Sequence, residues 1–269
     1  MASRILALPF VVVGLVSLYA AWEISESYSL YIIPCVVAIA LIFVFSPQID
    51  WWWYQRRPPK LDDRLVALIQ QYPFFQTLST EEKKKFLVRT ALFTFSTDFK
   101  SQSEDGVPTD IQTVVAACAV HLLFRKEKYL LPKFETVVVY PHPFPSPKYP
   151  EFEHVSEIYE EDGVLLFAAD QLMYGFLQPF QYYNIGLHEY AHAYVVSNPG
   201  IAWPKVEESV WDSLEQISSM KKEAIDEWIN RPDVEALLAC IVHYLTFPER
   251  FAAILPELKT AFDDILQSK

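Results

Sequence analysis

Two long stretches near the start of the chain, residues 5–22 and 28–47, contain no charged side chain. Each is close to the roughly 20 residues that an α-helix needs to cross the hydrocarbon core of a bilayer. The short segment between them is acidic, with Glu23 and Glu26. The pattern therefore predicts two transmembrane helices joined by a short loop. A cleaved signal peptide is the alternative for the first stretch, with Arg4 as its charged start.

Basic residues flank the two stretches on their outer sides. Arg4 precedes the first stretch, and a basic segment, residues 56–60, follows the second. Because positively charged flanks stay in the cytoplasm, both ends of the hairpin are expected there, with the acidic loop outside. The tryptophan run at residues 51–53 then lies at the cytoplasmic interface. We expect residues 1–56 to form a two-span anchor in the cell membrane and residues 57–269 to form a cytoplasmic domain.

Beyond the hairpin the hydrophobic spacing is mostly helical. Helices are predicted over residues 61–72, 111–124, 180–196, 222–230, 234–245 and 248–266, and another follows a capping box at Ser79 and Glu82. Pro73 is expected to end the first helix, Thr109 or Asp110 to cap the second, and Asp233 to cap the helix at 234. β-Branched residues predict a strand over 134–140 and a hairpin of 155–159 with 164–168, whereas 100–108 is expected to be a loop. The fold class is therefore α+β, mainly helical with a small sheet.

Composition narrows the classes of function. Hydrophobic residues make up 52% of the 269 residues and the mean hydropathy is +0.12, which is high for a soluble protein and agrees with membrane segments. The net charge of -12 argues against a nucleic-acid partner, because such a surface needs a basic patch. Cys35, Cys118 and Cys240 are too far apart in sequence for a disulfide framework or a Cys-x-x-Cys site, so we expect free, buried cysteines.

The strongest chemical signal is the sequence His188-Glu189-Tyr190-Ala191-His192, a His-Glu-x-x-His motif. On a helix, His188 and His192 lie one turn apart on the same face, where two neutral imidazoles can hold zinc. Zinc lowers the pKa of its bound water, and Glu189 is placed to act on that water as a general base. The alternative is the polar face of an ordinary helix whose histidines only form hydrogen bonds. The other histidines are expected in the core (His121) or on loop surfaces (His142 and His154).

A catalytic zinc ion usually has a third protein ligand. Among the downstream residues Glu235 is favoured, because it begins an otherwise apolar helix and a carboxylate entering such a core needs a partner. An exposed glutamate that interacts with the helix dipole is the alternative. The further candidates, between which spacing does not decide, are Glu207, Glu208, Glu215, Glu223, Glu227 and His243.

The chain resembles the MtfA-like (Mlc titration factor A) zinc-dependent peptidases over about residues 61–266. The resemblance is carried by segments 73–78, 137–144, 184–192, 225–226 and 232–251, which include Pro73-Phe74-Phe75, Asn184-Ile185-Gly186 before the motif, and Phe247-Pro248-Glu249. It implies a zincin-like domain, peptide or protein substrates, and Glu235 as the third zinc ligand. The founding member is soluble and has a transcription-factor partner, so the hairpin is an addition and that partner is not carried over.

Three positions depart from the family pattern. Trp228 stands where a tyrosine suited to oxyanion stabilisation is usual, and Val195 and Val242 replace acidic residues. Trp228, Tyr190 and Asn184 are candidates to stabilise an oxyanion or to support the zinc ligands.

We therefore expect a membrane-anchored zinc metallopeptidase. The rival interpretation is a zinc-bearing but weakly active membrane-tethered protein that sequesters a regulatory partner, which the departures around the ligands favour. An intramembrane protease is excluded, because the motif lies far from the two apolar stretches.

Overall fold

The computed structural model describes residues 2–101, 106–148, 150–231 and 234–267. The chain divides into two compact units, Met1–Pro59 and Lys60–Lys269. The mainly helical α+β class predicted from the sequence is confirmed, with a small four-stranded sheet and two apolar N-terminal helices.

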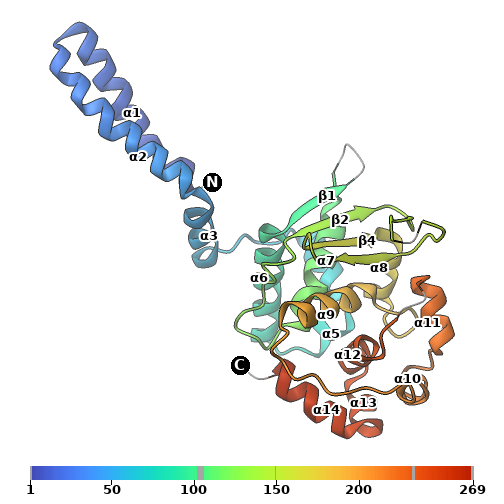
Figure 1. Ribbon diagram of the computed structural model, residues 1–269. Helices are drawn as coiled ribbons and strands as arrows, with labels where there is room; N and C mark the ends of the chain where they lie inside the picture. Colours follow the sequence, from blue (N-terminus) through green and yellow to red (C-terminus); the bar gives the residue numbers. More distant parts are fainter. Residues whose placement is uncertain (1, 102–105, 149, 232–233, 268–269) are drawn as a thin grey trace. The chain divides into compact units, whose positions relative to one another are not determined.

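The first unit is helical throughout its described part. It consists of α1 (Ala2–Glu23), η1 (Glu26–Tyr31), α2 (Ile32–Val44) and α3 (Ser46–Arg56), and α1 packs along α2 (Figure 1). Two segments, Ala2–Glu23 and Glu26–Val44, are long and apolar enough to cross a membrane, and only 11% and 6% of their most apolar windows are buried. Asp50 accepts hydrogen bonds from the backbone N–H and the hydroxyl of Ser3, at 2.8 and 3.1 Å, and so ties α3 to the start of α1.

The second unit holds the sheet and the motif. Its elements are α4 (Asp63–Gln70), α5 (Pro73–Thr77), α6 (Thr80–Ser96), β1 (Asp98–Ser101), α7 (Thr109–Leu122), β2 (Thr136–Tyr140), β3 (Ser156–Tyr159), β4 (Val164–Ala168), α8 (Ala169–Leu177), α9 (Ile185–Ser197), α10 (Val210–Ser218), α11 (Lys222–Ile229), α12 (Ala236–Thr246), α13 (Pro248–Ile254), α14 (Pro256–Phe262) and the π-helix η2 (Asp263–Gln267).

The strand order is β1-β2-β4-β3, and β3 lies at an edge. β1, β2 and β4 run parallel, whereas β3 pairs antiparallel with β4. Helices α6, α7, α8 and α9 lie on one side of this sheet (Figure 1), and α9 contacts both β3 and β4. The motif helix is therefore held beneath the edge strand.

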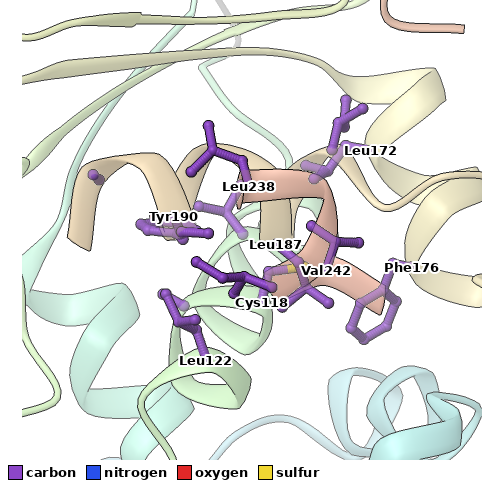
Figure 2. Close-up of a cluster of buried hydrophobic side chains, with 14 of the residues drawn as sticks. Cys118, Leu122, Leu172, Phe176, Leu187, Tyr190, Leu238 and Val242 are labelled. Carbon is purple, nitrogen blue, oxygen red and sulfur yellow. The ribbon is translucent and has the colours of Figure 1, made fainter. Parts of the chain in front are cut away.

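Four helices meet in the core around α9. Figure 2 shows side chains from α7, α8, α9 and α12 packed together: Cys118, Leu122, Leu172, Phe176, Leu187, Tyr190, Leu238 and Val242. All eight are buried. A Cβ atom at Gly186 would lie 2.7 Å from the sulfur of Cys118, so the absence of a side chain lets α9 approach α7 closely. Val242, named above as a departure from the family pattern, has its side chain in this apolar cluster.

Several details of the sequence reading are confirmed. The hairpin of β3 with β4 and the capping box of Ser79 with Glu82 are present. Other details were wrong. Pro73 begins α5 rather than only ending α4, and Pro256 divides the predicted helix 248–266 by opening α14, since proline suits the first helical position.

Further corrections concern the bounds of elements and helices that were not predicted. The motif helix starts at Ile185 and not near residue 180, and Pro108, not Thr109 or Asp110, occupies the N-cap position of α7. Strand β1 extends into the predicted loop at 100–108, and helices α8 and α10 were not predicted. The expected cap Asp233 lies outside the described residues, and Glu235 holds the N-cap position of α12.

Candidate metal centre

The helix that carries the motif is fixed at its start by Asn184. The Oδ1 atom of Asn184 accepts a hydrogen bond from the backbone N–H of Leu187 at 2.9 Å, which satisfies one of the free donors of the first turn. The thiol of Cys118 donates to the same oxygen at 3.7 Å. Asn184 therefore acts in this structure as the helix cap, and it supports the motif by setting where α9 begins.

His188 is fully buried and held by a tyrosine. The hydroxyl of Tyr183 lies 2.9 Å from Nδ1 of His188, and burial raises the pKa of Tyr183 well above its usual value. When Nδ1–H donates to this hydroxyl, the lone pair of the imidazole is on Nε2, which is the nitrogen that would face a metal. Tyr183 thus orients the ring of His188.

His192 lies one turn further along α9, with 17% of its side chain exposed. Its Nε2 atom is 3.6 Å from the carboxylate of Glu160, which lies in the turn between β3 and β4. Its Nδ1 atom is 3.9 Å from Oε2 of Glu189. The motif therefore has one fully buried imidazole, that of His188, and one partly exposed to solvent, that of His192.

The two oxygens of Glu189 have different environments. Oε1 accepts hydrogen bonds from the hydroxyl of Ser156 at 2.8 Å and from Nη1 of Arg231 at 3.1 Å. Oε2 is buried and accepts no hydrogen bond within the described part of the chain. Burial by itself raises the pKa of this carboxyl group, but the positive charge of Arg231, the two motif histidines and the Ser156 hydroxyl together hold it below its usual value. Glu189 is consequently an ionised, anchored carboxylate with one oxygen available.

This arrangement fits part of a zinc site. Two imidazoles on one helix face and a buried carboxylate oxygen that accepts no hydrogen bond match the groups that a zinc ion and its water require. Glu235 does not lie with these groups. It is exposed at the start of α12, and its side chain makes no capping hydrogen bond. Among the described residues no three His, Cys, Asp or Glu side chains are placed to hold a metal ion.

The two aromatic candidates for an oxyanion have other contacts. Trp228, in α11, donates its indole N–H to the backbone carbonyl of Tyr183 at 3.1 Å. Tyr190 is fully buried, with its ring edge-on to Phe93 at a centroid distance of 5.6 Å, and it lies in the apolar cluster (Figure 2). Trp228 therefore supports the residue that orients His188, whereas Tyr190 belongs to the core.

Several residues around the motif were not predicted from the sequence: Tyr183, Ser156, Glu160 and Arg231. Tyr183 directly precedes the motif segment in the sequence, which is the one local signal for it. Ser156, Glu160 and Arg231 reach the motif only through the fold, from β3, the turn after it and the segment after α11. Of the other histidines, His121 is in the core and His142 is on the surface as expected, but His154 is fully buried, which corrects its predicted surface position. It pairs with the buried Glu157 at 3.1 Å.

Cavities also lie outside the motif. One, of about 580 Å³, is lined by aromatic side chains including Tyr72, Phe74 and Phe247, and by no motif residue. Another, of about 410 Å³, lies between α11 and the start of β3, with Trp228 and Val155 in its wall. The second of these is adjacent to the edge strand.

Comparisons with known proteins show that the chain belongs to a metallopeptidase family. The family model described as glucose-regulated metallo-peptidase M90 matches residues 50–195, more than half of the 269-residue chain and including the motif. A protein of Synechocystis sp. described as uncharacterized is 24% identical over 165 residues. That match covers 57% of this chain and 60% of the relative's own length. The segment with Glu235 lies beyond the part that the family model matches.

Proposed function

Because the chain belongs to the family of glucose-regulated metallo-peptidases M90, we propose that it is a membrane-anchored, zinc-dependent peptidase in which Glu189 is the general base. The family supports a metallopeptidase function and peptide substrates. The identity of the metal, the residue roles and the anchoring are the parts that we propose.

The observation that carries the proposal is the asymmetry of Glu189. Ser156 and Arg231 hold Oε1, so the carboxylate has a fixed position, while the buried Oε2 is free of hydrogen bonds. A general base needs both features: a defined orientation and an oxygen that can take a proton. In the proposed reaction Oε2 accepts a proton from the attacking water and later delivers it to the leaving amine.

His188 and His192 would hold the metal, with Glu235 as the proposed third ligand. Zinc, when bound, supplies Lewis-acid chemistry, lowering the pKa of water to near neutrality and polarising the peptide carbonyl. Tyr183 contributes by fixing the ring of His188 through Nδ1. Such outer partners of metal ligands are worth about 10–100-fold in metal affinity or activity.

The edge strand β3 is the proposed binding surface for a substrate. It lies at the edge of the sheet beside β4 and contacts α9, so the edge strand and the motif helix are neighbours. An extended peptide can add to such an edge as a further strand, using main-chain hydrogen bonds that do not depend on sequence. This mode places a peptide bond close to Glu189, since Ser156 at the start of β3 bonds that carboxylate.

The N-terminal unit is the proposed anchor. The two apolar segments leave most of their side chains uncovered by protein, and a lipid environment would bury them. The basic residues that flank the hairpin favour a cytoplasmic position for residues 57–269. The peptidase domain would then act on cytoplasmic peptides or proteins at the membrane surface.

The first test is the substitution Glu189→Gln. Glutamine keeps an oxygen for Ser156 and Arg231 but cannot accept a proton, so peptide hydrolysis should fall by on the order of 10²–10⁴-fold. Zinc content, measured by elemental analysis of the purified full-length protein, should stay the same. Wild-type rates of peptide cleavage in the variant would contradict the mechanism.

A second candidate function is a zinc-bearing, weakly active protein that sequesters a regulator at the membrane. The specific observation in its favour is Trp228, whose indole bonds the Tyr183 carbonyl in the place where the family has a tyrosine. Turnover of a peptide library by the wild-type protein with stoichiometric zinc separates the two. Bound zinc without any cleavage would support the sequestering function.

A further inference from the structure

Alternate residues of β3 and of the turn after it point toward the motif helix. The hydroxyl of Ser156 donates to Oε1 of Glu189 at 2.8 Å, and four positions later Oε1 of Glu160 lies 3.6 Å from Nε2 of His192. Successive side chains of a strand face opposite sides of a sheet. Ser156, Ile158 and Glu160 therefore share the side of the sheet that meets α9.

The turn that carries Glu160 is held in place by its glycine. Gly163 has a φ of 65°, and a Cβ atom there would lie 1.9 Å from the carbonyl oxygen of Lys133. The turn thus packs directly on the main chain at Lys133, and Tyr159 pairs with Val164 at its base. The backbone therefore fixes the place from which Glu160 reaches His192.

The carboxylate of Glu160 stands at the edge of the proposed catalytic centre. Its side chain is 51% exposed, and among the described residues no lysine or arginine forms an ion pair with it. On the inner side of His192, the buried Oε2 of Glu189 lies 3.9 Å from Nδ1 and accepts no hydrogen bond within the described part of the chain. A negative charge that the protein itself does not neutralise therefore borders the site at which a peptide bond would be cleaved.

The ladder with β4 determines where a peptide can pair with β3. The carbonyl of Val155 accepts from the N–H of Ala168 at 2.7 Å, so by alternation the backbone groups of Ser156 and Ile158 face the outer edge. Arg231 donates to the carbonyl of Ser156 at 3.0 Å. A peptide added to this edge would therefore pair at Ile158 and lie between Arg231 and the turn.

We propose that Glu160 makes the peptidase select substrates with a lysine or arginine side chain within two residues of the cleaved bond. The inference rests on the proposed function, since it names the substrates of that site. Residues directly opposite each other on adjacent strands project to the same face, and opposite charges at such positions attract. The peptide residue beside Glu160 would thus place its cationic side chain against this carboxylate, next to His192.

The size of the effect follows from the exposure of Glu160. A partly exposed ion pair corresponds to a preference of about two- to fivefold, which would appear in kcat/KM as discrimination between substrates. Because salt screens exposed charges, the preference should decrease as ionic strength rises.

The experiment measures kcat/KM of the purified full-length protein on peptides acetylated at the N-terminus and amidated at the C-terminus. The two positions on each side of the cleaved bond carry lysine, glutamine or glutamate in turn. At one of these positions lysine should be preferred over glutamine by about two- to fivefold. Glu160→Gln should remove the preference, and Glu160→Lys should reverse it, so that glutamate peptides are cleaved faster than lysine peptides.

Glu161→Gln is the matched control. Glu161 belongs to the same turn and is also exposed, but among the described residues it forms no ion pair with the motif. This variant should keep the wild-type preference for lysine. Loss of the preference in Glu161→Gln to the same extent as in Glu160→Gln would contradict a specific role of Glu160.

Zinc affinity, measured by competition with a chromophoric chelator, separates a role in substrate selection from a role in metal binding. Glu160→Gln should bind zinc as the wild-type protein does. Zinc binding weakened by about tenfold or more, as loss of a group that supports the metal would give, would overturn the inference.

The remaining outcomes distinguish this inference from the proposed function. Equal cleavage of lysine and glutamine peptides by the wild-type protein, or a lysine preference that Glu160→Gln leaves unchanged, would overturn the role of Glu160 and leave the peptidase intact. A preference found only in peptides with a free N-terminus would show that a terminal ammonium group is bound, which also contradicts the inference. Absence of cleavage of blocked and free peptides alike would contradict the proposed function itself.

Discussion

Two buried histidines outside the motif show how burial sets the protonation of single residues. His121 bonds the hydroxyl of Tyr72 through Nδ1 at 2.7 Å and stacks on Phe74, and His243 bonds the Ala239 carbonyl at 2.7 Å. Burial lowers the pKa of His121 to about 3 and that of His243 to about 4. Both imidazoles are therefore neutral in the folded protein at pH values where the unfolded chain would protonate them.

This difference predicts acid sensitivity. Between about pH 6.5 and pH 4 the unfolded state binds more protons than the folded state, so the free energy of unfolding falls as pH is lowered. Each of the two histidines should contribute about 1.4 kcal/mol per pH unit in that window. Urea unfolding between pH 7.5 and 5 measures how steeply the free energy of unfolding changes with pH. His243→Gln should reduce this slope by the contribution of one histidine. An unchanged slope in that variant would show that His243 does not carry the effect.

At the scale of elements, the close approach of α8 to the start of α9 determines where the motif helix lies. A Cβ atom at Gly175 would stand 2.7 Å from the carbonyl oxygen of Tyr183 and 2.9 Å from Cα of Asn184. Both neighbours are backbone atoms, so they cannot move aside as a flexible side chain would. Tyr183 orients His188 and Asn184 caps α9, so this contact supports the candidate centre.

Gly175→Ala is therefore expected to lower the free energy of unfolding by roughly 1–3 kcal/mol, as overpacking of a core does. Gly200→Ala is the control, because a Cβ atom there meets nothing within 4 Å and the change should stay within about 0.5 kcal/mol. Denaturant unfolding of the two variants against wild type measures both effects. Equal stability of the two variants would contradict the importance of this contact.

Local sequence patterns predicted the types of most elements. The apolar segments on either side of the turn at residues 160–163 identified β3 and β4, and Ser79 with Glu82 identified the start of α6, because these signals depend on neighbouring residues. The start of α9 was missed since residues 180–184 are apolar or aromatic enough to continue the helical pattern, whereas tertiary packing and the Asn184 cap begin the helix later.

The environment of the motif could be predicted only in part. The three motif residues and their helix follow from the sequence, but Arg231 reaches Glu189 across 42 positions and Ser156 across 33. No periodicity connects such residues, because the contact depends on how α11 returns to β3. The proposed third ligand, Glu235, remains a prediction from the family resemblance.

At the scale of the whole molecule, the two units differ in how much apolar surface they expose. The helices of the N-terminal unit expose a run of large apolar side chains, among them Ile5, Val16, Leu41 and Phe43. The second unit, Lys60–Lys269, buries most of its large apolar side chains in one cluster. Exposed apolar surface of this extent requires lipid or a protein partner.

The membrane proposal is tested by fractionation. The full-length protein should remain with membranes through an alkaline carbonate wash, because two apolar spans resist extraction that removes peripheral proteins. A chain starting at Lys60 should be recovered in the soluble fraction. Protease added to intact cells should not cleave residues 57–269 if they face the cytoplasm. Release of the full-length protein by the wash would contradict the anchor.

The close packing of α7, α9 and α12 also makes two buried cysteines reporters of how often this core opens. Cys118 and Cys240 are completely buried, and burial raises the pKa of each to about 12, so an alkylating reagent meets neither an accessible sulfur nor a thiolate. Their modification must wait until the helices around the motif separate. The rate at which these two sulfurs are alkylated thus records how often that core opens in an otherwise native population.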